Sequence, residues 1–124
     1  MADEAVQLIE TAVARFMEEV PALKPMKLIA AVDFRGRGDT QQFRVELNGG
    51  APVVTRGVAA DAKVRVEMAR AFFNEMAKDA KIADWREAFM YGQAKASGPT
   101  QFLQLIERVV NKQEERDRLR RAQH

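Results

Sequence analysis

An α+β fold is predicted by a change in the spacing of apolar residues along the chain. Near both ends of the sequence these residues recur every three or four positions, as on one face of a helix. Between residues 27 and 68 they alternate with polar residues, as in strands with one face in water. The 124 residues are expected to form one domain, with helices covering a single face of a sheet.

The first element is expected to be an amphipathic helix over residues 3–20. Asp3 is placed to accept a backbone hydrogen bond as the N-cap, and Pro21 and Pro25 end the helix. Its apolar stripe consists of Val6, Ile9, Val13, Phe16, Met17 and Val20. A stripe of this kind has to be buried against another element, so the helix is expected to pack on the sheet.

Four alternating segments then predict four strands. They cover residues 27–34, 42–47, 52–56 and 63–68. A turn with two glycines over residues 35–39 separates the first two strands. Asn48-Gly49 is a pair favoured at positive φ, so a tight hairpin is expected after the second strand.

Helical spacing returns after residue 70. Two short helices are expected to bury an apolar set made of Phe72, Phe73, Met76, Ile82, Trp85, Phe89 and Met90. An extended segment over residues 93–97 follows, and Gly98-Pro99 opens a last helix. The stripe expected to be buried on that helix is Phe102, Leu105, Ile106 and Val109.

The charge of the chain is concentrated in its last residues. Residues 112–124 hold five basic and three acidic side chains, which equals the whole formal net charge of +2, so the body is balanced. We therefore divide the chain into a domain over residues 1–111 and a charged helical tail over residues 112–124. Pairs Glu114/Arg118 and Asp117/Arg121 are expected to support that helix. A nucleic-acid partner is not predicted, and at most a peripheral electrostatic contact with membranes through the tail is expected.

Catalytic chemistry is poorly represented. The chain has no cysteine, its only histidine is His124 and its only serine is Ser97, so a Ser/His or Cys/His pair is not expected inside the domain. The carboxylates have no calcium-loop spacing, and the glycines around Arg35 and Arg37 are explained by a turn. No enzymatic activity, metal or cofactor is predicted. Without signal-peptide or membrane-spanning features, the cytoplasm is the expected location.

Two segments resemble the sterol carrier protein (nonspecific lipid-transfer) domain family. Residues 88–92, Ala-Phe-Met-Tyr-Gly, match its Ala-Phe-Met-x-Gly turn before a short strand, and residues 60–66 match its Ala-Asp entry into a strand. The resemblance covers about residues 26–110. It implies a five-stranded mixed twisted sheet with helices on one face and an apolar tunnel between the layers. Departures are Ala94 and Ala96, where relatives carry bulky branched residues, and the charged tail, which replaces the peroxisomal address of some members.

The function that follows is non-covalent binding and intracellular transfer of fatty acyl chains, sterols or similar apolar molecules. The residues expected to line the cavity are Phe43, Val45, Val66, Phe72, Met76, Trp85, Phe89, Met90, Phe102 and Ile106. Each has the chemistry of ordinary core as well, since core and cavity wall use the same side chains. The alternative is an interaction or accessory module, oligomeric or monomeric, whose groove binds a partner segment or presents hydrophobic intermediates to an enzyme.

Overall fold

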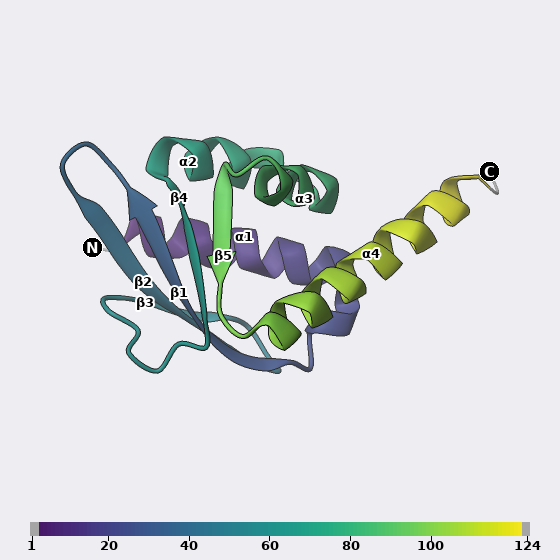
Figure 1. The fold of residues 1–124 in the computed structure, drawn as a ribbon, viewed down its shortest axis with the longest axis horizontal. Helices are drawn as coiled ribbons and strands as arrows, with labels where there is room; N and C mark the ends of the chain where they lie inside the picture. The colour runs from purple at the N-terminus through teal and green to yellow at the C-terminus, as the bar shows by residue number, and fades with distance from the viewer. Residues whose placement is uncertain (1–2, 123–124) are drawn as a thin grey trace.

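The computed structural model describes residues 3–122, so the predicted tail residue His124 lies outside the described part. The order of elements is α1 (Glu4–Glu19), the 3-10 helix η1 (Pro21–Leu23), β1 (Lys27–Arg35), β2 (Thr40–Asn48), β3 (Val53–Arg56), β4 (Val64–Ala69), α2 (Arg70–Asp79), α3 (Ile82–Met90), β5 (Ala94–Ser97) and α4 (Thr100–Ala122). Figure 1 shows the second half of α4 extending beyond the sheet and the other helices. The predicted α+β class is confirmed. None of the helices described is long and apolar enough to span a bilayer.

The sheet is mixed, with strand order β3-β2-β1-β4-β5. Neighbouring strands in the sheet run antiparallel, except that β1 and β4 are parallel to each other. Val32 is opposite Phe43 on one side and Val66 on the other, so the predicted apolar alternation places these three side chains on one face. That face carries the helices, because its buried residues share a core cluster with residues of α1, α2 and α3.

Aromatic rings join the sheet to the helices. Phe34 of β1 stacks on Phe73 of α2 with ring centroids 4.4 Å apart, and it also meets Phe43 of β2 at 5.5 Å. Trp85 of α3 lies 6.4 Å from Phe73. These rings fill the middle of the space between the two layers. A second, smaller cluster of Val20, Leu23, Ile82 and Val110 fixes the start of α3 against α4.

The opposite face of the sheet is covered by its own charged side chains. Ala31 and Asp33 are buried there although no helix crosses them. Arg65 of β4 donates to Asp33, and Arg44 of β2 donates to Asp61 at 2.9 Å. Long side chains lying flat over a central strand exclude water from it without a second layer of structure.

Helix α1 is anchored at its first turn to the edge of the sheet. Asp3 is the N-cap, as expected, and accepts from the backbone N–H groups of Ala5 and Val6. Its carboxylate also accepts two hydrogen bonds from Arg56 of β3, at 2.8 and 3.0 Å. The Arg56 guanidinium in turn lies 4.8 Å from the centre of the Phe43 ring. One aspartate therefore caps a helix and ties it to β3.

Three local expectations were wrong. The connection after β2 is not a tight hairpin, because the last residue of β2 that pairs with β3 is Glu46, opposite Val53, and residues 49–52 form a wider loop. Pro52 cannot donate to the ladder, and Asn48 accepts from the Gly50 N–H instead of closing a two-residue turn. On α4, Leu105 is 40% exposed and Val110 is buried in its place. In the tail, Glu114 pairs with Arg86 of α3 at 2.8 Å, and Asp117 accepts from Gln113.

The Asp3–Arg56 contact predicts acid sensitivity. The hydrogen bond from Arg56 lowers the pKa of Asp3 below the ordinary value of 3.8. Stability from this pair is therefore complete above that value and is lost as the pH falls through the lower pKa of the folded protein. Asp3→Asn should be less stable than wild type near neutral pH, and the difference should shrink below about pH 4. Denaturant unfolding at several pH values measures this, and a difference that is constant with pH would contradict it.

Candidate functional site

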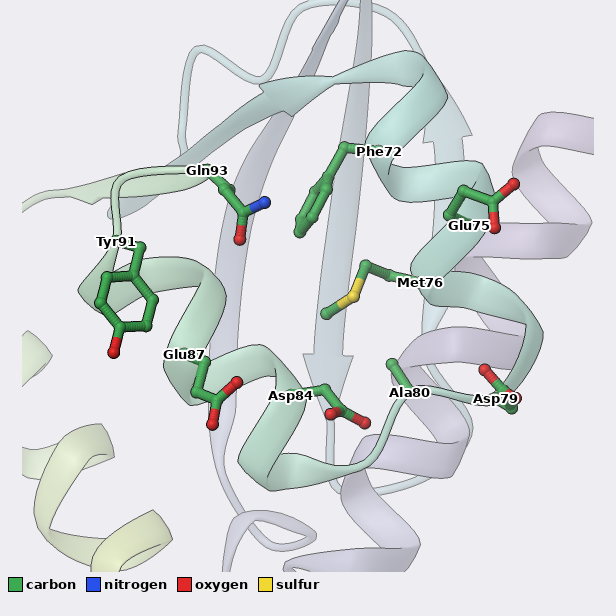
Figure 2. A pocket seen from close by; sticks show the side chains of 9 residues that line it. All are labelled: Phe72, Glu75, Met76, Asp79, Ala80, Asp84, Glu87, Tyr91 and Gln93. Carbon is green, nitrogen blue, oxygen red and sulfur yellow. The ribbon is translucent and has the colours of Figure 1, made fainter.

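A surface pocket lies where α2, α3 and the turn after α3 meet. Its volume is about 310 Å³. It is lined by Phe72, Glu75, Met76, Asp79, Ala80, Asp84, Glu87, Tyr91 and Gln93. Figure 2 shows Phe72 and Met76 pointing from α2 into the space in front of α3, with Gln93 reaching in from the other side. The pocket thus opens at a corner between two consecutive helices.

The floor of the pocket belongs to the core. Phe72 and Met76 are half-buried, and both pack against the cluster that contains Phe34, Phe43 and Phe73. They stand one turn apart on α2, a spacing that puts both side chains on the same side of the helix. The thioether of Met76 can adopt several shapes at small cost. An apolar molecule on this floor would touch the core without crossing a polar layer.

The rim of the pocket is acidic. Glu75 and Asp79 come from α2, whereas Asp84 and Glu87 come from α3. Glu75 contacts the exposed Lys78 at 3.2 Å, and Asp84 accepts from the backbone N–H of Lys81 at 2.8 Å, which caps α3. These acids were not among the residues predicted from the sequence to form a site. Their spacing, i to i+4 on one helix and i to i+3 on the next, was the available signal that each pair shares a helix face.

Helix α1 holds the corner that forms the pocket. Arg15 donates to the carbonyl oxygens of Ala77 and Lys78 at the end of α2, at 3.1 and 3.2 Å. One turn further along α1, Glu19 accepts from the backbone N–H of Ile82 at the start of α3, at 3.1 Å. Helix ends have backbone groups without partners inside the helix, and these two side chains satisfy three of them. The path of the chain from α2 to α3 is thereby fixed.

The structure brings six of the ten predicted ligand residues around one cluster. Phe43 and Val45 are fully buried in it, and the half-buried members that pack on it are Val66, Phe72, Met76 and Trp85. Ile106 belongs to the second cluster on α4, and Phe102 is half-buried on the same helix. Only Phe72 and Met76 also line the pocket. Their contact with a ligand remains a prediction for all ten.

Phe89 and Met90 do not join Trp85 in the apolar cluster that the spacing predicted. Their exposures are 39% and 62%. Helix α3 instead turns Ile82, Trp85 and Ala88 inward, at intervals of three residues. Ala88 is small enough to let the helix approach the sheet closely, and a bulky side chain at that position would not fit. The apolar pair at the end of α3 therefore lies on the surface.

Comparison with known proteins rests on structure alone, because no family model and no curated protein sequence matches the chain. The sterol carrier protein domain 2 of Helicoverpa armigera superposes with a TM-score of 0.57 at 13% identity, covering 90% of this chain and 92% of that one. The palmitated sterol carrier protein 2-like 2 of Aedes aegypti gives 0.56 at 19% identity, with coverages of 82% and 93%. The chain has the fold of sterol carrier protein 2.

Two further neighbours show the settings in which the sterol carrier protein 2 fold occurs. The ubiquinone synthesis protein UbiJ-SCP2 matches with a TM-score of 0.54 at 13% identity, over 92% of this chain and 96% of that one. A sec-alkyl sulfatase matches with 0.53 at 14% identity, over 87% of this chain but 16% of its own. The fold is thus found as a nearly complete chain and as a small part of an enzyme. Within residues 3–122, no group of three metal-ligating side chains is gathered.

The positions of the two phenylalanines predict unequal costs of truncation. Phe73→Ala removes a buried ring stacked on Phe34 and should lower the free energy of unfolding by about 3–5 kcal/mol. Phe89→Ala removes a ring that is 39% exposed and should cost below about 1 kcal/mol. Denaturant unfolding of both variants tests the assignment. Equal losses would show that Phe89 lies in the core.

Proposed function

We propose that this chain binds lipid or another long apolar molecule non-covalently and acts as its carrier. The observation that supports this most directly is the double position of Phe72 and Met76, which line the surface pocket and pack on the aromatic core. A ligand chain that passes the acidic rim between α2 and α3 meets apolar side chains that continue into the core. The fold shared with sterol carrier protein 2 domains supports the same function.

Binding in this scheme depends on apolar burial. Each methylene transferred from water contributes about 0.8 kcal/mol, so an acyl chain gains affinity in proportion to the length it buries. The pocket of about 310 Å³ is at the lower end of the range usual for ligand sites. A long chain therefore requires Phe72 and Met76 to rotate and α2 to move away from the sheet. The tunnel expected between the layers would form in this movement, with Val66 and Trp85 as parts of its wall.

A carrier role also agrees with the chemistry of the side chains. The chain has no cysteine and one histidine, at position 124, so the nucleophile and base pairs common in hydrolases and transferases are not supplied by the domain. None of the pocket-lining residues is a serine, cysteine, histidine or lysine. The ligand would be held and released unchanged.

A second candidate is an accessory module that presents a hydrophobic intermediate to an enzyme. It is favoured by the similarity to the ubiquinone synthesis protein, which covers 92% of this chain. The two candidates share the same ligand site. They differ in the next step, since a carrier passes its ligand to a membrane whereas a module keeps it and binds an enzyme. Ligand exchange with vesicles in the absence of other proteins separates them.

Ligand binding predicts a difference between two matched variants. Phe72 and Phe16 are both half-buried, but Phe72 lines the pocket and Phe16 packs on the cluster formed by Val20 and Ile82. Phe72→Ala should weaken binding of acyl and sterol probes roughly tenfold or more, because the ligand loses a ring it contacts. Phe16→Ala should reduce stability and leave affinity nearly unchanged. The fluorescence of Trp85, the only tryptophan, reports binding.

Two outcomes would count against the proposal. If delipidated, folded wild type gives no saturable Trp85 response to any apolar probe, the chain is not a lipid carrier. If both alanine variants weaken binding equally, the ligand does not enter at the pocket between α2 and α3. Denaturant unfolding of each variant is measured in parallel, so a loss of structure is recognised.

The end of α4 predicts attachment to anionic membranes. Arg116, Arg118, Arg120 and Arg121 are exposed on a part of the helix that extends beyond the body, as Figure 1 shows. Replacing all four by glutamine should reduce binding to vesicles that contain anionic lipid, since each cation near such a surface contributes about 1 kcal/mol. Binding to neutral vesicles is the control. If wild type and the variant with four glutamines sediment equally with anionic vesicles at low salt, the tail does not have this role.

A further inference from the structure

We propose that the mouth of this pocket selects ligands whose polar end carries no negative charge. This inference rests on the function proposed above and names the chemical class of its ligand: alcohols, esters, ketones or amines with a long apolar part, in preference to fatty acids and anionic phospholipids. It follows from the charge of the rim together with the apolar floor. Four of the pocket-lining side chains are carboxylates and none is basic.

Two of these four acids have no ion-pair partner within residues 3–122. At several other acids an arginine neutralises the carboxylate directly, as in Arg56 with Asp3 at 2.8 Å and Arg70 with Asp39 at 2.8 Å. On the rim, Asp79 and Glu87 make no ion pair with any residue in the range 3–122. Part of the negative charge of the mouth therefore has no ion-pair partner within this range.

The basic residues near the pocket leave the net charge of its mouth negative. Lys78 contacts Glu75, but its side chain is 68% exposed and it does not line the pocket. Lys81 is exposed and offers Asp84 its backbone N–H. Arg15 points at carbonyl oxygens at the end of α2, and Arg86 pairs with Glu114. Counting the two lysines against the four rim carboxylates leaves a net charge of −2, and counting Arg15 as well leaves −1.

The position of the acids makes this charge act on the ligand head. The apolar part of an amphiphile on Phe72 and Met76 would place its polar end at the opening, near Asp84 and Glu87 of α3. Figure 2 shows Glu75 and Asp79 further out, on the side of α2 away from Phe72 and Met76. A carboxylate or phosphate there is repelled by the acids that line the pocket, and the protein wall on one side weakens the screening by water. An uncharged hydroxyl or carbonyl avoids this repulsion. It can also bond to the amide of Gln93 or the hydroxyl of Tyr91, which line the same opening.

Three ligands with the same alkyl chain test the inference. Dodecanoate, dodecanol and dodecylammonium are titrated into delipidated protein below their aggregation limits, with Trp85 fluorescence as readout. At low salt and near-neutral pH, we expect dodecanol to bind about tenfold more tightly than dodecanoate, and dodecylammonium at least as tightly as dodecanol. Added salt should reduce the difference between the two charged probes, because screening acts on the head and not on the chain.

Matched variants assign the effect to the rim. The triple substitution E75Q/D79N/E87Q removes three of the charges and keeps Asp84, which caps α3. It should strengthen dodecanoate binding about tenfold, weaken dodecylammonium binding and leave dodecanol unchanged. The control E18Q/E107Q/E115Q removes the same charge from exposed positions that do not line the pocket, and it should change little.

The outcomes distinguish failure of this inference from failure of the proposed function. If none of the three probes binds, the carrier function itself is wrong. If all three bind with equal affinity, or if the control triple shifts the affinities as much as the rim triple, ligands are bound without selection by the mouth. Far-ultraviolet circular dichroism of both triple variants establishes that they are folded, so that either result decides.

Discussion

The stacking of Phe73 on Phe34 is the contact on which the two layers depend. Phe34 lies on β1, the strand at the centre of the sheet, and Phe73 lies on α2, the helix that carries the pocket floor. With centroids 4.4 Å apart, these rings set the distance between sheet and helix at that point. Because Phe72 is next to Phe73 in sequence, it must leave the helix at a different angle. The same contact that closes the core thus turns Phe72 toward the surface pocket.

Helix α1 adds a second constraint, because it holds both the edge of the sheet and the α2–α3 corner. Its first turn is tied to β3 through Asp3 and Arg56, and its last turns bond to the backbone of α2 and α3 through Arg15 and Glu19. Any separation of α2 from the sheet has to keep these bonds or break them. The contacts at this corner are three hydrogen bonds, two from Arg15 to carbonyl oxygens and one from a backbone N–H to Glu19. Such bonds allow rotation about the corner more easily than a packed apolar interface would. Ligand entry by rotation of α2 is compatible with this attachment.

The fold was predictable from the sequence where apolar residues kept one regular spacing along a whole element. The site was predictable only in part. Alternation over residues 42–47 and 63–68 identified the strands, and the apolar spacing around Phe73 identified α2. The predictions failed where apolar residues at spacings of three and of four both fit a helix face, as on α3. Phe89 and Trp85 are four apart and were assigned to one face, but the small Ala88 is the residue that is buried beside Trp85, and Phe89 is 39% exposed. The acids of the pocket rim were missed because a helix face with two carboxylates is indistinguishable in sequence from solvated surface. Only the pocket, which is lined by residues of both α2 and α3 at one corner, identifies these acids as a rim.

Asp79 occupies a position that conflicts with the preference of helices for basic residues at their C-terminal ends. It is the last residue of α2, where the partial charge of the helix end is negative and a carboxylate is disfavoured. Arg15 donates to the carbonyl oxygens of Ala77 and Lys78 at that same end, which offsets the negative field there. The guanidinium therefore allows an acid at a helix end without pairing with it, and the Asp79 carboxylate is left among the pocket-lining groups. A local rule that is broken and then compensated by a residue from a distant element is most simply explained by a use for the carboxylate. Under the selection proposed above, this carboxylate adds to the negative charge that a ligand head meets at the pocket.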